Sequence, residues 1–587
     1  MTGRTPAAPL AMLVLLLSLL LGGCVSLPVK GPVQAGAGPS QAPDVSVEVA
    51  PEAPQPGASP RTIAEGFLQA MASYQQGYPV ARQYLASSVR DSWRPEDGVT
   101  VYADGYGVTS GPESALLQAP QVGQVGPDGA FSHGEGTLRH DFGMVRDVDG
   151  EWRISHPPQG LLISQYLFGK FYQQASVYFF DPSWRTLVPD PVFLPRGNQT
   201  PTALLQALLR GPTDWLKPAV VTAVPTQAKL NVQAAYVDSL GVVEISLNDA
   251  VQGLAEDQRS RVAAQIAWTL GQVSGVSGVR LTVNGAPWSV REQNQAGVIP
   301  ISAYGSLDPV PPASQSTLLG ATADGVVTIS DGSSPATLAP VAGPLGRTGG
   351  VSGMAATPTG DRIAVITGNG TDLLVGQSND TPLEPLVSNG QGLLRPQYLP
   401  GRELELWTIL DGPLGQQAWV RIGSAVQRVA LSGFDGTRVT AFRVSPDGTR
   451  MAVIRVRDGI SELGLVRVNR AQPELTIDGW RTVPLSDEAN PGPRRLLDVA
   501  WQDASTLLVL GSEDDKKPVK PYRVDQSAAE LTEIGQPDNW QATSLAVAPR
   551  RVGTRAVVVG RTGAWRYEDD YRWPLLTRDV LVAAYTG

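Results

Sequence analysis

Three kinds of hydrophobic pattern follow one another along the chain. From Leu10 to Leu21 every residue except Ser18 is apolar. Between residues 60 and 300, apolar residues at helical spacing alternate with short segments in which every second residue is apolar. After about residue 315 the helical spacing ends, and short hydrophobic segments separated by Gly- and Pro-rich turns recur. The pattern predicts a leader, a mixed α and β region, and an all-β region.

The first apolar segment has the length of a signal-peptide core and is shorter than the roughly 20 residues of a membrane-spanning helix. Arg4 precedes it, and it ends in Leu21, Gly22, Gly23 and Cys24, the single cysteine of the chain. These four residues resemble the lipobox of bacterial lipoproteins, which implies S-diacylglycerol and N-acyl groups on Cys24. We therefore expect a lipid anchor that holds the protein on the extracytoplasmic face of the cell membrane. The alternative is an ordinary secretory signal with a chance cysteine.

The following segment lacks the apolar residues needed for a core. Residues 28–60 are rich in Pro, Gly, Ala and small polar residues, so we expect a tether over 25–59. Ser59 before Pro60 predicts a helix start, and a second apolar series runs from Val80 to Leu85. Strands are expected at 99–102, 137–139 and 151–154. We interpret residues 60–185 as a small α+β domain with two helices against a curved sheet.

Residues 186–300 show a second α+β pattern. Thr200-Pro201 opens a helix that Gly211-Pro212 closes, and apolar residues alternate over 242–247. Val262, Ile266 and Leu270 line one side of a further helix, and Asn284-Gly285 is a strong hairpin signal. The segments LLRGPT at 208–213, VVEISL and GVSGVRLTVNG at 275–285 resemble a GerMN domain, a module of cell-envelope and sporulation proteins.

The region 301–587 carries a repeated hydrophobic strand. Five copies are visible, and equivalent positions within them lie 42 to 55 residues apart. These positions are Ala364, Leu406, Val453, Leu508 and Val558. Ser445-Pro446-Asp447-Gly448 resembles the turn of many bacterial propellers. The period predicts a β-propeller whose blade number stays open, because residues 325–330 provide a further strand for the first or the last blade.

The predicted order is a signal peptide at 1–24, a tether, two α+β domains and an all-β propeller. This order resembles the LpqB family of actinobacterial lipoproteins over nearly the whole chain. The resemblance implies association with the extracellular region of the sensor kinase MtrB, and modulation of the MtrAB two-component system in cell-wall metabolism and division. It implies no catalytic residues.

Composition narrows the possible functions. The net charge of −9 disfavours a nucleic-acid partner, and a hydrophobic content of 42% is typical of globular domains. With one cysteine, no disulfide can form within the chain. His133, His140 and His156 lack the spacing of a metal motif, so we expect no metal, no cofactor and no catalytic group.

Two acidic segments are candidate sites. Glu568-Asp569-Asp570 lies among Trp565, Tyr567, Tyr571 and Trp573, which is compatible with sugar binding or glycoside hydrolysis. We favour aromatics that pack the last blade, and a solvated loop for residues 513–520. The leading hypothesis is a non-enzymatic accessory partner of a sensor kinase. The alternatives are a binder of peptidoglycan or polysaccharide and, third, a hydrolase using Glu568 or Asp569.

Overall fold

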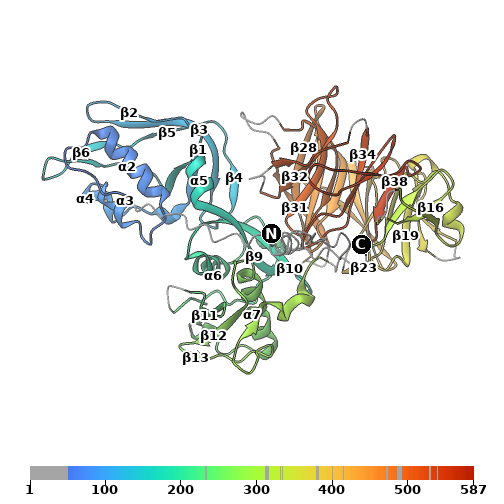
Figure 1. Cartoon of the computed structure of the whole chain (residues 1–587), viewed down its shortest axis with the longest axis horizontal. Helices are drawn as coiled ribbons and strands as arrows, with labels where there is room; N and C mark the ends of the chain where they lie inside the picture. Colours follow the sequence, from blue (N-terminus) through green and yellow to red (C-terminus); the bar gives the residue numbers. More distant parts are fainter. Residues whose placement is uncertain are drawn as a thin grey trace, which may run out of the picture. The chain divides into compact units, whose positions relative to one another are not determined.

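A computed structural model describes residues 51–587 except for 232–234, 311–315, 331, 333–334, 379–381, 400, 414, 471–473, 486–491, 528–530 and 538–539 (Figure 1). The expected signal peptide, the lipobox and most of the tether lie outside the described residues. The last part of the expected tether belongs to the first domain, since the hydroxyl of Tyr84 donates to the carbonyl of Glu52 at 2.8 Å. The amide of Gly57 also donates to the carboxylate of Glu151 at 2.7 Å.

The first domain packs short helices against a curved, mostly antiparallel sheet. Its helices are α2 (Pro60–Ala72), α3 (Pro79–Gln83), α4 (Ser87–Arg90) and α5 (Gln165–Phe171). Its strands are β1 (Val99–Tyr102), β2 (Val108–Ser110), β3 (Ala115–Val125), β4 (Phe131–His133), β5 (Thr137–Asp141), β6 (Met144–Arg146), β7 (Trp152–Ile154) and β8 (Leu161–Ser164). The predicted start of α2 is confirmed, because the hydroxyl of Ser59 accepts from the amide of Thr62 at 3.2 Å.

The second helix predicted for this domain is present but short. The apolar series from Val80 to Leu85 forms only the five residues of α3 before the chain straightens. Leu85 then forms a bridge with Ile154, the last residue of β7, and the amide of Ala86 donates to the carbonyl of Ile154 at 2.8 Å. An apolar series therefore marked burial here, but strand pairing and not helix formation satisfied the backbone.

A long hairpin joins the first two domains. Strands β9 (Tyr172–Phe180) and β10 (Leu187–Pro195) pair over their full length. Phe193 stacks on Phe168 of the first domain at 5.3 Å between ring centroids, while Val177 and Phe179 lie in the core of the second domain. The boundary expected between residues 185 and 186 falls in the turn of this hairpin. We therefore propose that the second domain begins near Tyr172.

The second domain contains α6 (Thr200–Arg210) and α7 (Glu256–Leu270) with a small sheet of β11 (Val242–Leu247), β12 (Gly278–Val283), β13 (Ala286–Pro287) and β14 (Ile299–Pro300). The predicted helices, the strand and the hairpin are confirmed. Asn284 and Gly285 have φ of 49° and 81°, as the tight turn between β12 and β13 requires. Strands β11 and β12 are parallel, so the chain needs a crossover connection between them, and α7 provides it.

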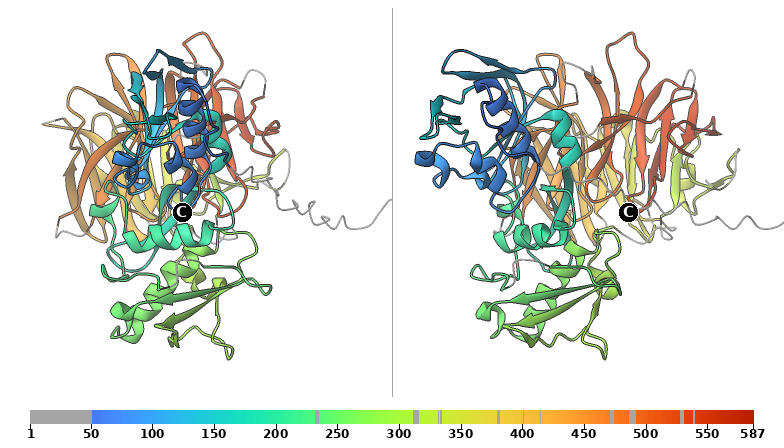
Figure 2. Two further views of the ribbon diagram at one scale, coloured as in Figure 1. Left: turned by 90° about the vertical axis from the view of Figure 1, so that its left-hand side faces the viewer. Right: turned by 60° about the vertical axis from the view of Figure 1, so that its left-hand side comes forward.

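The C-terminal region forms six four-stranded antiparallel sheets within the described residues, arranged as the blades of a propeller (Figures 1 and 2). Blade 1 contains β15 (Leu318–Ala321), β16 (Val326–Ile329), β17 (Leu338–Pro340) and β38 (Val582–Tyr585). Blade 2 contains β18 (Gly353–Ala356), β19 (Arg362–Thr367), β20 (Asp372–Gln377) and β21 (Glu384–Val387). Blade 3 contains β22 (Gln397–Leu399), β23 (Arg402–Gly412), β24 (Gly415–Ile422) and β25 (Ala425–Ala430).

The remaining blades repeat this arrangement. Blade 4 contains β26 (Arg438–Val444), β27 (Arg450–Arg457), β28 (Ile460–Asn469) and β29 (Thr476–Thr482). Blade 5 contains β30 (Arg495–Trp501), β31 (Thr506–Ser512), β32 (Lys520–Asp525) and β33 (Leu531–Glu533). Blade 6 contains β34 (Ala542–Val547), β35 (Ala556–Gly560), β36 (Gly563–Arg566) and β37 (Leu575–Thr577). The five strands found by period are β19, β23, β27, β31 and β35, each the second strand of its blade.

The ring is closed by both ends of the propeller sequence. The C-terminal strand β38 pairs with β15 from Leu318↔Tyr585 to Ala321↔Val582, and so completes blade 1. Residues 326–329 are the third strand of that blade, which answers the question that the sequence left open. Closure completes blade 1, so that each of the six described blades has four strands.

Candidate functional site at the junction of the second domain and the propeller

Five propeller arginines hold the second domain. They come from blades 3, 4 and 6, and each reaches a residue of the hairpin, the turn after α6, α7 or the linker that follows. They are Arg402, Arg450, Arg467, Arg481 and Arg551. Arginine suits such a junction because its planar guanidinium carries several donors and retains its charge when buried.

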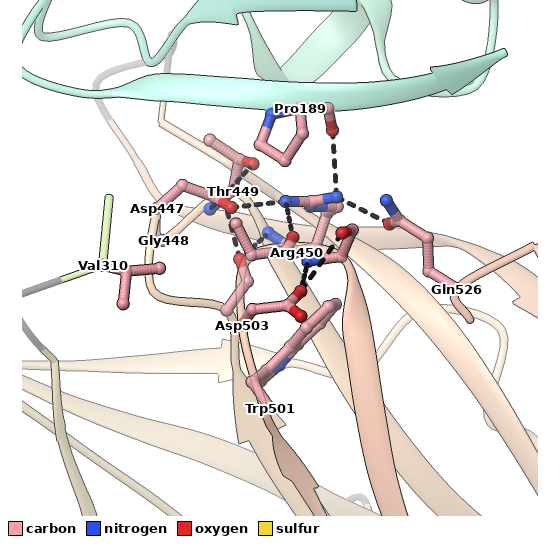
Figure 3. Close-up of polar contacts among 12 residues, drawn as sticks. Pro189, Val310, Asp447, Gly448, Thr449, Arg450, Trp501, Asp503 and Gln526 are labelled. Atoms are coloured by element: carbon pink, nitrogen blue, oxygen red, sulfur yellow. Dashed lines mark hydrogen bonds and ion pairs between the residues drawn. The ribbon is translucent and has the colours of Figure 1, made fainter. Parts of the chain in front are cut away.

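Arg450 lies at the centre of this junction (Figure 3). It is fully buried, although it is the first residue of β27. One guanidinium nitrogen donates to the carbonyl of Pro189 in β10 at 3.1 Å and to the side chain of Gln526 at 2.6 Å. The other donates to the carbonyl of Ala504 at 3.0 Å and pairs with Asp447. A single side chain therefore links the second domain to blades 4 and 5.

The local sequence prepares Asp447 for this pair. The Asp447 carboxylate accepts from the hydroxyl of Ser445 at 2.8 Å and from the amide of Thr449 at 2.9 Å, so the turn is folded around it. Gly448 has φ of 78°, which favours glycine at this position. Burial acts to raise the pKa of Asp447, but the Arg450 charge and the Thr449 donors outweigh it and lower the pKa. Asp447 is therefore ionised and compensates Arg450.

Two further contacts fix the orientation of the second domain. Arg402 at the start of β23 pairs with the buried carboxylate of Asp181 at 2.7 Å. The indole nitrogen of Trp215 donates to the carbonyl of Gly479 in β29 at 2.7 Å, and the Arg481 guanidinium lies 4.3 Å from the Trp215 ring. Contacts to blades 3 and 4 at separate points restrict rotation about any single one.

Asp190 of β10 is a buried acid beside this cluster. It accepts from the amide of Thr213 at 2.7 Å and from its hydroxyl at 2.9 Å. Burial raises the pKa of Asp190 to about 6, against the opposing effect of Thr213, Arg450 and Arg481. The folded protein therefore keeps a proton on Asp190 at pH values where the unfolded chain has lost it.

We expect Asp190→Asn to remove a pH-dependent part of the stability. Because the folded pKa is raised, wild-type stability falls as the pH rises from about 4 to about 6 and is flat above that. Between pH 4 and pH 7, the free energy of unfolding of the wild type should fall by about 2–3 kcal/mol relative to that of the variant. Urea unfolding of both proteins at pH 4.5 and 7.5 measures this difference. A difference that does not change with pH would contradict the assignment of Asp190.

The central channel of the propeller is narrow. The inner strands of the blades line a cavity of about 60 Å³, which holds a few water molecules but no sugar ring. One guanidinium nitrogen of Arg395 donates to both carboxylate oxygens of Asp498, at 2.9 and 3.2 Å. Burial raises the pKa of Asp498 although Arg395 lowers it. This ion pair therefore links blade 3 to blade 5.

The histidines lie apart from this junction. His140 in β5 and the backbone carbonyl of His156 are 3.0 Å apart, and burial lowers the pKa of His140. His133 ends β4 and packs on Phe131 at 5.1 Å. Within the described ranges, no group of three His, Cys, Asp or Glu side chains is arranged to hold a metal ion.

The acidic segment of blade 6 is occupied by its own neighbours. Asp570 accepts from Arg523 at 2.8 Å and from the hydroxyl of Tyr567 at 2.6 Å, and these donors lower its pKa. Trp565 and Trp573 are buried with Trp540, at centroid distances of 6.1 and 5.7 Å. The packing interpretation is confirmed for Trp565 and Trp573, whereas Tyr571 is 87% exposed and does not pack the blade. The loop 513–519 connects β31 to β32, as expected.

Sequence reasoning singled out the turn at 445–448 but missed that Arg450 beside it is the junction. In the sequence, the five arginines of the junction look like ordinary surface residues. The repeated arginine at the start of second strands, at 362, 402 and 450, is the one available signal.

The lipobox residues Leu21, Gly22, Gly23 and Cys24 are outside the described residues. None of the described helices is long and apolar enough to span a membrane.

Together, the fold and the junction define a multidomain protein that joins an α+β domain and a GerMN-like domain to a propeller. Three family models match it in this order: "Lipoprotein LpqB, N-terminal domain" at 53–169, "Sporulation and spore germination" at 176–288 and "Lipoprotein LpqB beta-propeller domain" at 324–579. Lipoprotein LpqB of Cutibacterium acnes is 31% identical over 97% of this chain and 98% of its own. The chain belongs to the LpqB family of lipoproteins.

A more distant lipoprotein LpqB also matches. Lipoprotein LpqB of Rhodococcus opacus is 27% identical over 70% of each chain. Among solved structures, the first GerMN domain of the sporulation protein GerM from Bacillus subtilis is 20% identical over 22% of this chain and 95% of that chain, with a TM-score of 0.18. The family identifies the chain as an envelope lipoprotein of the membrane.

Proposed function

We propose that this lipoprotein is a non-enzymatic accessory partner of an MtrB-like sensor histidine kinase in the MtrAB two-component system. It would act in cell-envelope homeostasis and division, from the extracytoplasmic face of the membrane. The observation that supports this proposal most is the junction at Arg450. It joins the second domain and the propeller into one body, as a protein that presents a composite docking surface requires.

Anchoring supports the same proposal. Two partners confined to one membrane surface meet at a raised effective concentration, so a weak direct contact suffices. The narrow channel offers no support for hydrolysis, and Glu568 and Asp569 both pair with Arg572, at 3.5 and 2.8 Å. Binding and not turnover is therefore the activity that the described residues favour.

Capture of the kinase tests the proposal. Full-length protein in detergent micelles is passed over the immobilised extracellular domain of the MtrB-like kinase. We expect retention that Arg450→Met weakens at least about tenfold and that Arg457→Ala, an exposed arginine of the same strand, leaves unchanged. If neither micelles nor membrane vesicles are retained, the kinase is not the partner.

We further propose that Cys24 carries the lipid anchor. In Cys24→Ser, the thioether cannot form, so we expect the protein to leave the membrane fraction or to keep its signal peptide. Fractionation of cells and mass spectrometry of the amino terminus measure both outcomes. A processed Cys24→Ser protein that still sediments with membranes would contradict the proposal.

A further inference from the structure

In blades 2, 3 and 4, the second strand begins with an arginine. Arg402 receives Asp181 and Arg450 receives the carbonyl of Pro189, so both equivalents in blades 3 and 4 bind acceptors of the second domain. Arg362 is the equivalent in blade 2. It is partly exposed, and it has no ion-pair partner among the described residues. The second domain does not use this arginine.

Other clefts between blades neutralise their arginines. Arg470 pairs with Glu405 between blades 4 and 3 at 3.0 Å, and Arg523 pairs with Asp570 between blades 5 and 6 at 2.8 Å. The cleft between blades 2 and 3 differs, since Arg421 in β24 also lacks an ion-pair partner in the described part of the chain. Its Nε donates to the carbonyl of Gly423 at 2.9 Å, which holds the guanidinium at the cleft.

Strand register places both arginines at one recess. Arg362 pairs with Gln377 in blade 2, two residues beyond the apolar pair Ala364↔Val375 that packs against blade 3. Tyr398 and Arg421 both flank Leu406 in blade 3. The recess between them has a volume of about 250 Å³, slightly below the roughly 300 Å³ of typical small-molecule pockets. It lies at the polar end of an apolar core between blades.

The lining suits an anion that also carries hydroxyl groups. The two guanidiniums supply donors and positive charge, whereas the carboxylate of Glu384 at the rim accepts hydroxyl protons. Burial raises the pKa of Tyr398, so its hydroxyl remains a donor. Asp361 lies beside Arg362, but its carboxylate accepts from the Thr357 hydroxyl at 2.6 Å. A bare acidic side chain would leave most of the recess empty and would offer no hydroxyl group to Glu384.

We propose that the cleft between blades 2 and 3 binds an anionic sugar, with its carboxylate or phosphate group between Arg362 and Arg421 and its hydroxyl groups on Tyr398 and Glu384. Such sugars occur within polymers of the cell envelope, where this lipoprotein is located. This proposal does not depend on the kinase partnership, so either proposal can fail alone.

Titration calorimetry of the full-length protein in detergent micelles tests the site with four probes. They are glucuronate, glucose 6-phosphate, glucose and N-acetylglutamate amide. We expect one anionic sugar to bind with a Kd below about 1 mM, and glucose to bind at least about tenfold more weakly. Arg362→Gln and Arg421→Gln should each weaken the anionic sugar at least about tenfold. Arg428→Gln, on the exposed edge strand β25, should not.

Each other result overturns the assignment. If neither anionic sugar binds, or if glucose binds equally, the recess does not recognise an anionic sugar. If the Arg362 and Arg421 variants keep the wild-type melting temperature and affinity, the sugar binds elsewhere. If N-acetylglutamate amide binds in preference to both sugars, the cleft receives a protein carboxylate instead. If a Gln variant fails to fold, Arg362→Lys serves instead. It retains the positive charge and should therefore retain part of the affinity.

Discussion

Replacing Arg450 by methionine should destabilise the protein by about 3–5 kcal/mol, because the buried carboxylate of Asp447 loses its charge partner. The same change removes donors from the carbonyls of Pro189 and Ala504. Both carbonyls lie at the junction, so the substitution weakens the contact between the second domain and the propeller. Urea unfolding of the full-length protein measures the change in the free energy of unfolding.

Hydrogen exchange shows whether the junction itself is lost. Amides of β9 and β10 should exchange faster in Arg450→Met, while those of α2 in the first domain should not change. Arg457→Ala is the matched control, since Arg457 is exposed on the same strand and should change stability by less than about 0.5 kcal/mol. Equal unfolding of Arg450→Met and the wild type would show that the junction is not held by this arginine.

Removal of residues 582–587 should have the larger effect, because it opens the propeller ring. Strand β15 would lose its partner along Leu318–Ala321, and the bond from the amide of Thr586 to the carbonyl of Thr317 at 2.9 Å would be absent. An exposed strand edge of this kind promotes aggregation. We expect a lower melting temperature with loss of a single cooperative transition, and aggregation on light scattering.

A point variant isolates the packing part of this closure. Tyr585 is 5% exposed in the core of blade 1, so Tyr585→Ala should cost about 3–5 kcal/mol. Tyr571 is 87% exposed, and Tyr571→Ala should leave stability nearly unchanged. A truncated protein that melts like the wild type would mean that β38 does not close the ring.

Local sequence signals predicted the elements that depend on local chemistry. Ser59-Pro60 marked the start of α2, and Asn284-Gly285 marked the hairpin, because capping and left-handed backbone are set by the residues themselves. The hydrophobic second strands also gave five blades by period. Blade 1 escaped this count because its strands come from opposite ends of the propeller sequence, and no contiguous repeat describes it.

The junction could not be predicted because burial of a polar residue depends on the partner that covers it. Arg450 and Arg457 begin and end the same strand, yet one is fully buried and the other exposed. The hairpin β9–β10 decides this difference, and it lies more than 250 residues away in the sequence. The boundary expected at 185 raises a related difficulty, since a turn that contains a proline, such as Pro182, can lie within a hairpin as readily as between domains.

Crosslinking in intact cells tests most directly whether this lipoprotein docks on the kinase from the membrane. Wild-type protein should give a crosslinked product that contains the MtrB-like kinase, identified by mass spectrometry. The product should be lost from Cys24→Ser and reduced in Arg450→Met, but retained in Arg457→Ala. If wild-type protein gives abundant products without the kinase, or if Cys24→Ser gives the kinase product undiminished, the proposed membrane-anchored partnership is wrong.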